Sequence, residues 1–264
     1  MNKILIVKSI FSPNDDIFTN TYLSLINLYK FNSFFKLDII LLGWITNSDN
    51  KTKIEKLIDG NKNINTIVDF WDINYGKYYL FNKINEYISN HKTKYDGILY
   101  FDHDIIVMSL DKMINISNKL LNHMLDNKNI GSIVYNQKGD SRHQLDIYEH
   151  KKCIDDEIIL YSDKMNIMSI AMGCFFMSVE CFMLCTPMEN ISVYGMDDYI
   201  LCSNVIKNNF NIIVTLNISI YHPFHNDKKY IEWKNEMIKK IINKDIKYEE
   251  SIIDSMLFFK NENN

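Results

Sequence analysis

Two acidic residues stand one residue apart at the end of an apolar segment, in the stretch ILYFDHDIIVM at 98–108. Neighbouring carboxylates repel each other and lose hydration on burial, so Asp102 and Asp104 would be costly in a strand that only fills a core. In a strand, residues i and i+2 face the same side. Mg²⁺ and Mn²⁺ prefer carboxylate oxygens and commonly share them with phosphates. The pair predicts a divalent cation that holds a nucleoside diphosphate; the alternative is a surface turn where the strand ends.

A second acidic pair, Asp197 and Asp198, occurs in YGMDDYILCSNV at the predicted start of a helix. Acidic residues are favoured there by helix capping and by the helix dipole, which is one interpretation of the pair. The other interpretation is catalytic. A partly desolvated carboxylate beside another acid has a raised pKa, which suits a general base.

Two histidines follow an apolar segment in IYHPFH, at 220–225. A single histidine at a strand end is more often a structural hydrogen-bonding group. Here His222 and His225 lie within four residues, and Pro223 fixes the turn between them. Imidazole binds metal ions, so the spacing predicts a metal or phosphate contact.

The first 110 residues alternate between two patterns. β-Branched segments predict strands, and amphipathic segments between them predict helices. The predicted strands cover 3–10, 37–45, 64–71 and 96–107, and the helices cover 17–31, 52–60 and 77–90. This alternation predicts an α/β fold with a Rossmann-like, mostly parallel sheet between two layers of helices. Ligands of such sheets bind beyond the carboxyl ends of the strands, where Asp102 and Asp104 lie.

The second half of the chain is less regular and predicts a mixed arrangement. Helices are predicted at 111–127, at 196–208 and in the tail after 228, and strands at 131–136 and 172–178. The segment 210–225 predicts either a strand pair or one long bent strand. The polar segment 137–164 predicts a long connection over the site. Without a repeat or a change in composition, residues 1–264 predict one domain with two halves, 1–110 and 111–264.

Composition excludes several classes of protein. The chain has 264 residues, 47% of them hydrophobic, which is enough to bury a large core. A net charge of −4 without a block of basic residues argues against a nucleic-acid-binding surface. Five cysteines without a CxxC pair predict reduced thiols and a cytoplasmic protein. The N-terminus lacks the features of a signal peptide, and no segment approaches the roughly 18 apolar residues of a membrane span.

Taken in order, these features resemble glycosyltransferases of the GT-A fold, which use nucleotide-sugar donors. In that superfamily a strand ends in Asp-X-Asp, here Asp-His-Asp at 102–104, and a small-residue strand follows, matched by GCFFMS at 173–178. In the inverting family-two members an acidic pair then opens a helix, matched by DDYILC at 197–202, before a Val-Tyr-His element, matched by ISIYHP at 218–223. The chain departs from the pattern at Ile200, where the family has a further acid, and it lacks the basic residue found further along the helix.

The resemblance implies a donor, a cofactor and an acceptor. The donor would be a nucleotide sugar, with UDP favoured, the cofactor Mn²⁺ or Mg²⁺, and the acceptor a glycan, a protein or a small molecule. Asp104 would bind the metal, and Asp102 would contact the metal or the ribose. His222 would be the third metal ligand, ahead of His225. The implied nucleotide-binding residues are Ser9, Phe11, Ser12, Asn14, Trp44, Thr46, Lys77, Asp102 and His103.

The resemblance also implies how the reaction would proceed. Asp198, or its neighbour Asp197, would be the general base of an inverting sugar transfer. Residues 1–110 would bind the nucleotide and the rest of the chain the acceptor. Three side chains are placed on the acceptor side by position alone: Tyr135, Arg142 and His143.

Four alternatives stay open. Retaining family-eight-like enzymes share the Asp-X-Asp motif and the late histidine. A sugar nucleotidyltransferase shares the architecture, but its glycine-rich phosphate-binding loop has no counterpart in SIFSPNDD, at 9–16. A phosphatase of the haloacid dehalogenase type has its Asp-X-Asp on the first strand, before a tight turn, whereas Ile105 and Ile106 follow here. A non-catalytic relative would bind the nucleotide sugar without transferring it.

Overall fold

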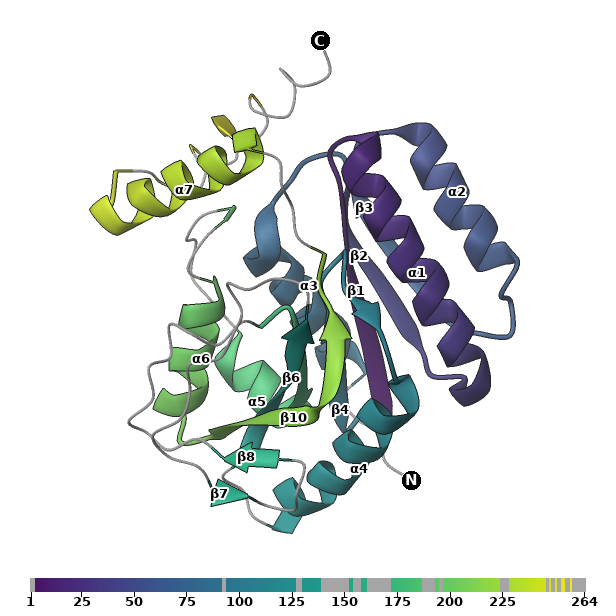
Figure 1. Cartoon of the computed structure of the whole chain (residues 1–264), viewed down its shortest axis with the longest axis vertical. Helices are drawn as coiled ribbons and strands as arrows, with labels where there is room; N and C mark the ends of the chain where they lie inside the picture. The colour runs from purple at the N-terminus through teal and green to yellow at the C-terminus, as the bar shows by residue number, and fades with distance from the viewer. Residues whose placement is uncertain are drawn as a thin grey trace.

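A computed structural model describes residues 3–91, 94–126, 130–138, 152–153, 158–160, 172–186, 193–194, 197–223 and 228–245, with the further positions 247, 250, 253–254 and 257 (Figure 1). Strands and helices alternate through the first half: β1 (Ile4–Ser12), α1 (Asp15–Phe35), β2 (Ile39–Ile45), α2 (Ser48–Asp59), β3 (Thr66–Trp71), α3 (Gly76–Asn90), β4 (Gly97–Phe101) and β5 (Ile106–Val107). The second half contains α4 (Leu110–Asp126), β6 (Ile130–Lys138), β7 (Lys152–Cys153), β8 (Ile158–Leu160), β9 (Cys174–Ser178), α5 (Val179–Cys185), α6 (Asp197–Lys207), β10 (Asn211–Tyr221) and α7 (Lys228–Asn243).

The strands form one sheet in the order β3-β2-β1-β4-β9-β6-β10-β8-β7, and β5 pairs with β10. β1 pairs in parallel with β2 and β4, and β2 in parallel with β3. β9 is antiparallel to both of its neighbours, β4 and β6, while β6 and β10 are parallel to each other. The carboxyl ends of β1 to β4, β6 and β10 therefore all lie at the same edge of the sheet. The strand order reverses between β1 and β4, which is where open α/β sheets bind their ligands.

Apolar side chains alternate along β1 and supply both faces of the sheet. Ile4, Ile6 and Ile10 join a core covered by α1, α2 and α4, whereas Leu5 and Val7 join a second core covered by α3, α5 and α6. Burial of both faces explains why the central strands are mainly apolar. The α/β fold with a mostly parallel sheet between helices, predicted from the alternating pattern, is confirmed.

The structure differs from the predicted elements in two places. The predicted strand 96–107 is interrupted after Phe101, because residues 102–105 form a turn and β5 leaves to pair with β10. Helix α5 had not been predicted. The segment 210–225 contains one long strand, β10, with a register shift between Thr215 and Ser219, which matches the second of the two predictions for it. Of the predicted connection 137–164, positions 137–138 and the short strands β7 and β8 lie within the described residues.

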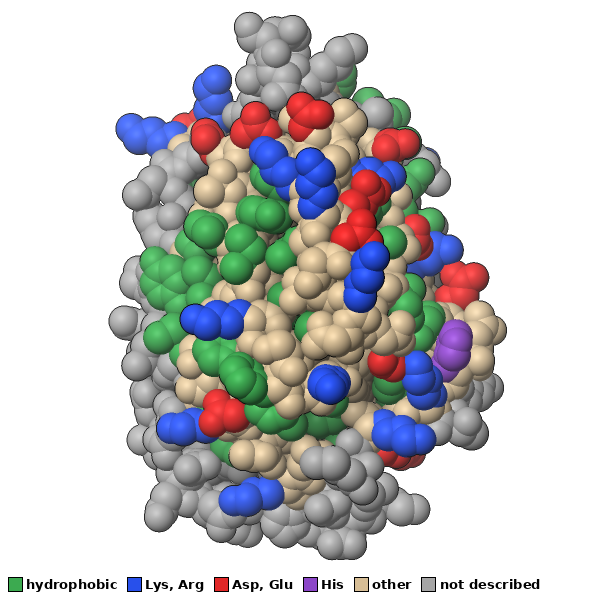
Figure 2. All heavy atoms as spheres, turned by 90° about the vertical axis from the view of Figure 1, so that its right-hand side faces the viewer, with side chains coloured by type: hydrophobic (Ala, Val, Ile, Leu, Met, Phe, Trp, Pro, Cys, Tyr) green, Lys and Arg blue, Asp and Glu red, His purple; other side chains and the backbone are tan. Residues whose placement is uncertain are grey.

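The C-terminal helix α7 lies above the tips of β6 and β10 (Figure 1). Its buried side chains Tyr230, Trp233 and Met237 pack with Trp44 at the end of β2 in a small third core. Among the described residues, no helix combines the length and apolarity that crossing a bilayer would require. The side of the molecule formed by α1 and α2 shows basic and acidic side chains interspersed with apolar ones (Figure 2).

Gly43→Ala in β2 is expected to destabilise the fold by about 2–4 kcal/mol. The backbone of Gly43 has a φ of +147°, and an added Cβ would lie 2.0 Å from the carbonyl oxygen of Ile10. Urea-induced unfolding measures the loss. Gly60→Ala is the matched control, because Gly60 has a φ of −67° and its added Cβ would have no neighbour nearer than 3.5 Å. Equal stability of the two variants would contradict the prediction.

Candidate active site

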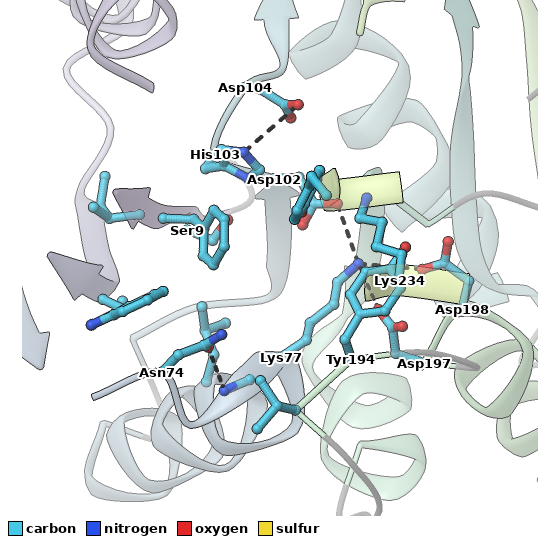
Figure 3. Close-up of a pocket in the computed structure, with 18 of the residues that line it drawn as sticks. Ser9, Asn74, Lys77, Asp102, His103, Asp104, Tyr194, Asp197, Asp198 and Lys234 are labelled. Atoms are coloured by element: carbon cyan, nitrogen blue, oxygen red, sulfur yellow. Dashed lines mark hydrogen bonds and ion pairs between the residues drawn. The ribbon is translucent and has the colours of Figure 1, made fainter. Parts of the chain in front are cut away.

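A cavity of about 310 Å³ opens at the carboxyl ends of β1, β2 and β4, under α7. Ten of the residues proposed from the sequence line it: Ser9, Phe11, Trp44, Lys77, Asp102, His103, Asp104, Asp197, Asp198 and His222. They come from segments far apart in the chain, and Figure 3 shows Ser9, Lys77 and the two acidic motifs around the cavity. The two acidic motifs and the first of the late histidines thus share one cavity.

The turn after β4 directs the first aspartate of the motif toward the cavity. The Asp102 N–H donates to the Gly173 carbonyl at 2.7 Å, and the Ile105 N–H donates to the Asp102 carbonyl at 3.2 Å. The Asp102 carboxylate accepts a hydrogen bond from the Tyr100 hydroxyl at 2.7 Å and one from the Lys77 ammonium at 3.3 Å. Asp102 is therefore held in one orientation by two side chains.

Asp104 is only 1% exposed, and two imidazoles stand beside its carboxylate. Nε2 of His222 is 3.6 Å from Oδ1, and Nε2 of His103 is 3.8 Å from Oδ2. His222 reaches this position because β10 ends against β5, where Tyr221 pairs with Ile106. The pairing of two strands more than 100 residues apart thus brings the late histidine to the metal motif.

Lys77 connects the two acidic motifs (Figure 3). Its Nζ lies 3.3 Å from Oδ2 of Asp102, 3.3 Å from Oδ2 of Asp197 and 3.2 Å from Oδ1 of Asp198. Burial by itself would lower the pKa of Lys77, but the three carboxylates outweigh it and raise the pKa well above its usual value. Lys77 therefore stays protonated and offsets part of the negative charge in the cavity.

The start of α3 fixes the place of Lys77. Gly76 has a φ of +78°, and an added Cβ would lie 2.5 Å from the Val193 carbonyl oxygen, so only glycine fits there. The Asn74 side chain accepts a hydrogen bond from the Gly76 N–H at 3.0 Å. This close approach brings the helix start beside the segment that leads to α6.

The acidic pair that opens α6 has different surroundings at its two positions. The side chain of Asp197 is 19% exposed and that of Asp198 is 34% exposed. Burial raises the pKa of Asp197, Lys77 opposes the rise, and the charge of Asp198 adds to it. Asp198 is the more accessible carboxylate of the two.

Aromatic side chains form the wall under α7. Phe11 packs edge-on against Trp44 at 5.5 Å, and Tyr230 stacks on Trp233 at 5.7 Å. Lys234 lies 4.5 Å from the centre of the Tyr230 ring and brings a cation to the cavity. We did not predict these α7 residues as part of the site. The spacing of aromatic residues in KKYIEWK (228–234) was the available signal, but it does not reveal where the helix packs.

Sequence reasoning also missed cavity residues in the first half. They are Ile10, Gly43, Trp71, Asn74, Gly76, Leu80 and Tyr100, and Val193 and Tyr194 were missed later in the chain. Trp71 had a usable signal, because it ends a predicted strand beside Trp44, with which it pairs in register. The others are apolar, backbone or loop contacts without a distinctive pattern.

Three residues proposed for the nucleotide lie outside the cavity lining. Asn14 caps α1 by accepting a hydrogen bond from the Ile17 N–H at 2.9 Å. Thr46 donates to the Ser12 carbonyl at 3.3 Å, and Ser12 itself is 1% exposed. These residues hold the ends of β1 and β2 in place.

Four proposed residues remain: three on the acceptor side, and His225, the second choice after His222 as a metal ligand. Tyr135 is fully buried, and its hydroxyl shares a hydrogen bond with Ser117 at 2.7 Å, so it belongs to the core. Arg142, His143 and His225 lie outside the described residues.

The residues present fit a cation that takes few protein ligands. In the described part of the chain, no group of three or more His, Cys, Asp or Glu side chains could by itself hold a metal ion. Mg²⁺ is commonly bound by one or two carboxylates and completed by phosphates and water. Nε2 of His222 and Oδ1 of Asp104 lie 3.6 Å apart, close enough to bind one ion together after a small adjustment of their side chains. Asp104 and His222 are therefore suitable ligands.

No known protein-family profile and no curated protein matches the sequence. The structure is similar to a mannosyltransferase, PcManGT from Pyrobaculum calidifontis, solved with GDP-Man and Mn²⁺. Its TM-score is 0.58 at 8% identity, over 89% of this chain and 61% of that protein. GalNAc-T7, solved with UDP, GalNAc and Mn²⁺, gives 0.54 at 10% identity, over 86% of this chain and 45% of that one. The chain thus spans less than two thirds of either glycosyltransferase.

A nucleoside-diphosphate-sugar pyrophosphorylase from Vibrio cholerae RC9 is also similar, with a TM-score of 0.50 at 11% identity, over 83% of this chain and 92% of that one. The protein therefore has the fold of the GT-A-type glycosyltransferases, as we predicted, and shares it with this pyrophosphorylase. At identities of 8–11%, this structural similarity establishes the fold alone, because one fold hosts many activities.

Lys77→Met is expected to lower the free energy of unfolding by about 1–3 kcal/mol at pH 7. Without the ammonium, the remaining carboxylates repel each other, and the pKa of Asp197, which burial already raises in the folded state, rises further. An acid with a raised folded pKa is destabilising above that pKa, and the penalty is lost as falling pH protonates it. The difference from the wild type should therefore shrink between pH 7 and about pH 4.

Urea unfolding across this pH range checks the prediction. Lys83→Met is the matched control, because Lys83 lies on the same helix and pairs at 2.9 Å with exposed Glu86. Its effect should stay below about 0.5 kcal/mol at every pH. A pH-independent loss in Lys77→Met would count against the charge cluster.

Proposed function

We propose that this protein is a glycosyltransferase that moves a sugar from a nucleoside diphosphate donor, with UDP favoured, to an acceptor hydroxyl. The observation that carries the proposal is the convergence of the two acidic motifs and His222 in one cavity at the point where the strand order reverses. A fold shared with two glycosyltransferases that were solved with nucleotides and Mn²⁺ supports it.

Asp104 and His222 are proposed to hold Mn²⁺ or Mg²⁺ beside the donor diphosphate, and Asp102 to contact the ribose or, through water, the ion. When bound, such an ion stabilises the charge that develops on the leaving nucleoside diphosphate. Lys234 on α7 and Lys77 on α3 are the lysines in the cavity lining. They supply further positive charge around the two phosphates.

The nucleoside is proposed to lie over the ends of β1, β2 and β3. Ser9, Phe11 and Trp44 line this part of the cavity, together with Trp71 and Asn74. Aromatic rings offer stacking surfaces, and the serine and asparagine offer polar contacts, a combination typical of small-molecule sites. Ser12, Asn14 and Thr46 would act indirectly, by fixing the strand ends.

Asp198 is proposed as the general base of an inverting transfer, because the more exposed carboxylate of the pair is better placed to reach an acceptor. The acceptor hydroxyl gives its proton to Asp198 while its oxygen bonds to the anomeric carbon. The bond from that carbon to the diphosphate oxygen breaks, and the electron pair leaves with the diphosphate. Lys77, 3.2 Å from Asp198, favours the ionised carboxylate that this step requires.

A sugar nucleotidyltransferase is the second candidate, because the pyrophosphorylase covers 83% of this chain. Such an enzyme would transfer a nucleotidyl group to a sugar phosphate and release pyrophosphate. The loop after β1 counts against it, since residues 9–16 contain no glycine to bring backbone N–H groups close to phosphates. Incubation with UTP and a sugar 1-phosphate distinguishes the two, because only the nucleotidyltransferase releases pyrophosphate.

Nucleoside diphosphates are expected to stabilise the protein much more with Mn²⁺ than in EDTA, where they bind only weakly. Ligand at about 100 times its dissociation constant contributes about 2.7 kcal/mol, which corresponds to a rise in melting temperature of about 5–10 °C. A thermal-shift screen of UDP, GDP and their sugars, with Mn²⁺ or EDTA, measures this. Asp104→Ala should lose the shift, whereas Asp111→Ala, an exposed position on α4, should keep it. A shift that survives in Asp104→Ala would contradict the metal assignment.

Asp198→Asn is expected to lower kcat by about 10²–10⁴ while nucleotide binding with Mn²⁺ is retained, because the amide cannot accept the acceptor proton. Release of UDP, measured against a panel of acceptor sugars, gives the rate. Asp197→Asn is the neighbouring control and should lose less. The opposite ranking would assign the base to Asp197, and full turnover in both variants would exclude the pair as the base.

A further inference from the structure

Lys8 is a buried cation that the proposed chemistry does not use. It lies in the middle of β1 and is 1% exposed. On a strand it shares a face with Ile6 and Ile10, which are core residues. Burying an ammonium group costs several kcal/mol unless nearby groups compensate for the lost hydration. A methionine or leucine would fill the same space without that cost, so the charge of Lys8 calls for an explanation.

The Lys8 ammonium binds the inner side of the turn that carries the metal motif. Its Nζ donates to the Asp102 carbonyl and, at 3.3 Å, to the Ile105 carbonyl. These are the first and last residues of the interruption between β4 and β5. Both carbonyls therefore face Lys8, and the Asp102 carbonyl also accepts from the Ile105 N–H within the turn.

α1 holds the same segment from a second direction. The hydroxyl of Ser24, which is fully buried, donates to the His103 carbonyl at 2.8 Å. The Asn27 side chain accepts a hydrogen bond from the Val107 N–H at 2.9 Å. The turn backbone is thus bound by side chains of β1 and α1 along its length, which leaves its own acidic side chains for other contacts.

The charge of Lys8 also acts on the metal motif. Among the charges around its ammonium, Asp104 attracts it most strongly and Asp102 comes next. The Asp104 carboxylate in turn lies 3.6 Å from His222.

We propose that Lys8 is a positioning residue of the cation site, which fixes the turn at 102–105 so that the Asp104 carboxylate stands beside His222. Lys8 does not itself touch the cation or the donor. The proposal rests on the proposed function in one respect, because it assumes that this site binds a divalent cation. Its prediction is that loss of Lys8 weakens the binding of Mn²⁺ more than the binding of nucleotide alone.

Lys8→Met keeps the length and apolar stem of the side chain and removes the ammonium. Titration calorimetry of the folded protein with Mn²⁺ in the presence of UDP should show at least a tenfold loss of Mn²⁺ affinity, about 1.4 kcal/mol. UDP binding measured in EDTA should change less than twofold. Ile6→Val is the matched control, because it shortens a side chain on the same face of β1, and it should leave the Mn²⁺ affinity unchanged.

A role limited to filling the core would alter the melting temperature and leave the Mn²⁺ affinity of the folded protein unchanged, and that result would overturn the proposal. If Lys8→Met does not fold, Ser24→Ala decides, because it releases the same turn at the His103 carbonyl. We expect at least a threefold loss of Mn²⁺ affinity, and an unchanged affinity would overturn the proposal.

Failure of the proposed function is a separate result. If the wild type binds no nucleoside diphosphate with Mn²⁺, that function is wrong whatever Lys8 does. Hydrogen exchange of the amides at 102–105 in the free protein then decides the positioning role. Exchange at least tenfold faster in Lys8→Met than in Ile6→Val supports it, and equal exchange refutes it.

Discussion

Four carboxylates in one cavity are the constraint on which the site depends. Asp102, Asp104, Asp197 and Asp198 all line a space at the end of a buried sheet, where mutual repulsion and lost hydration oppose folding. Two lysines offset part of this negative charge. Lys77 lies between the two motifs, and Lys8 lies beneath the first. An excess of acid remains, which is the electrostatic condition for recruiting a divalent cation and, with it, a diphosphate.

The local part of this arrangement could be predicted from the sequence. Strand and helix periodicity depends on neighbouring residues, so the alternation through β4 and the place of Asp102 at the sheet edge followed from pattern alone. The meeting of Asp104 with His222 was implied only by the family resemblance and could not follow from local pattern, because it depends on pairing between β5 and β10. β5 is two residues long, and a segment that short has no periodicity to read.

Two other features were hidden for related physical reasons. The aromatic face of α7 reads as an ordinary amphipathic helix, and only its packing on Trp44 makes Tyr230 and Trp233 part of the cavity wall. Lys8 in ILIVKSIF reads as a polar interruption of an apolar strand. Its meaning depends on carbonyl groups about a hundred residues away, which turn inward only because β4 is interrupted after Phe101. Long-range backbone geometry, more than residue type, decided what sequence reasoning missed.

The fold by itself does not select the chemistry, since a pyrophosphorylase and two glycosyltransferases share it. Two features favour sugar transfer: the segment after β1 and the position of the second acidic pair. A nucleotidyl transfer needs a phosphate cradle after β1, and that segment instead carries the helix cap Asn14 and no glycine. An acceptor hydroxyl needs a base, and α6 presents Asp197 and Asp198 to the same cavity, linked to Asp102 through Lys77. Because Lys77 contacts both motifs, a change in charge at Asp102 alters the electrostatic surroundings of Asp198, the proposed base.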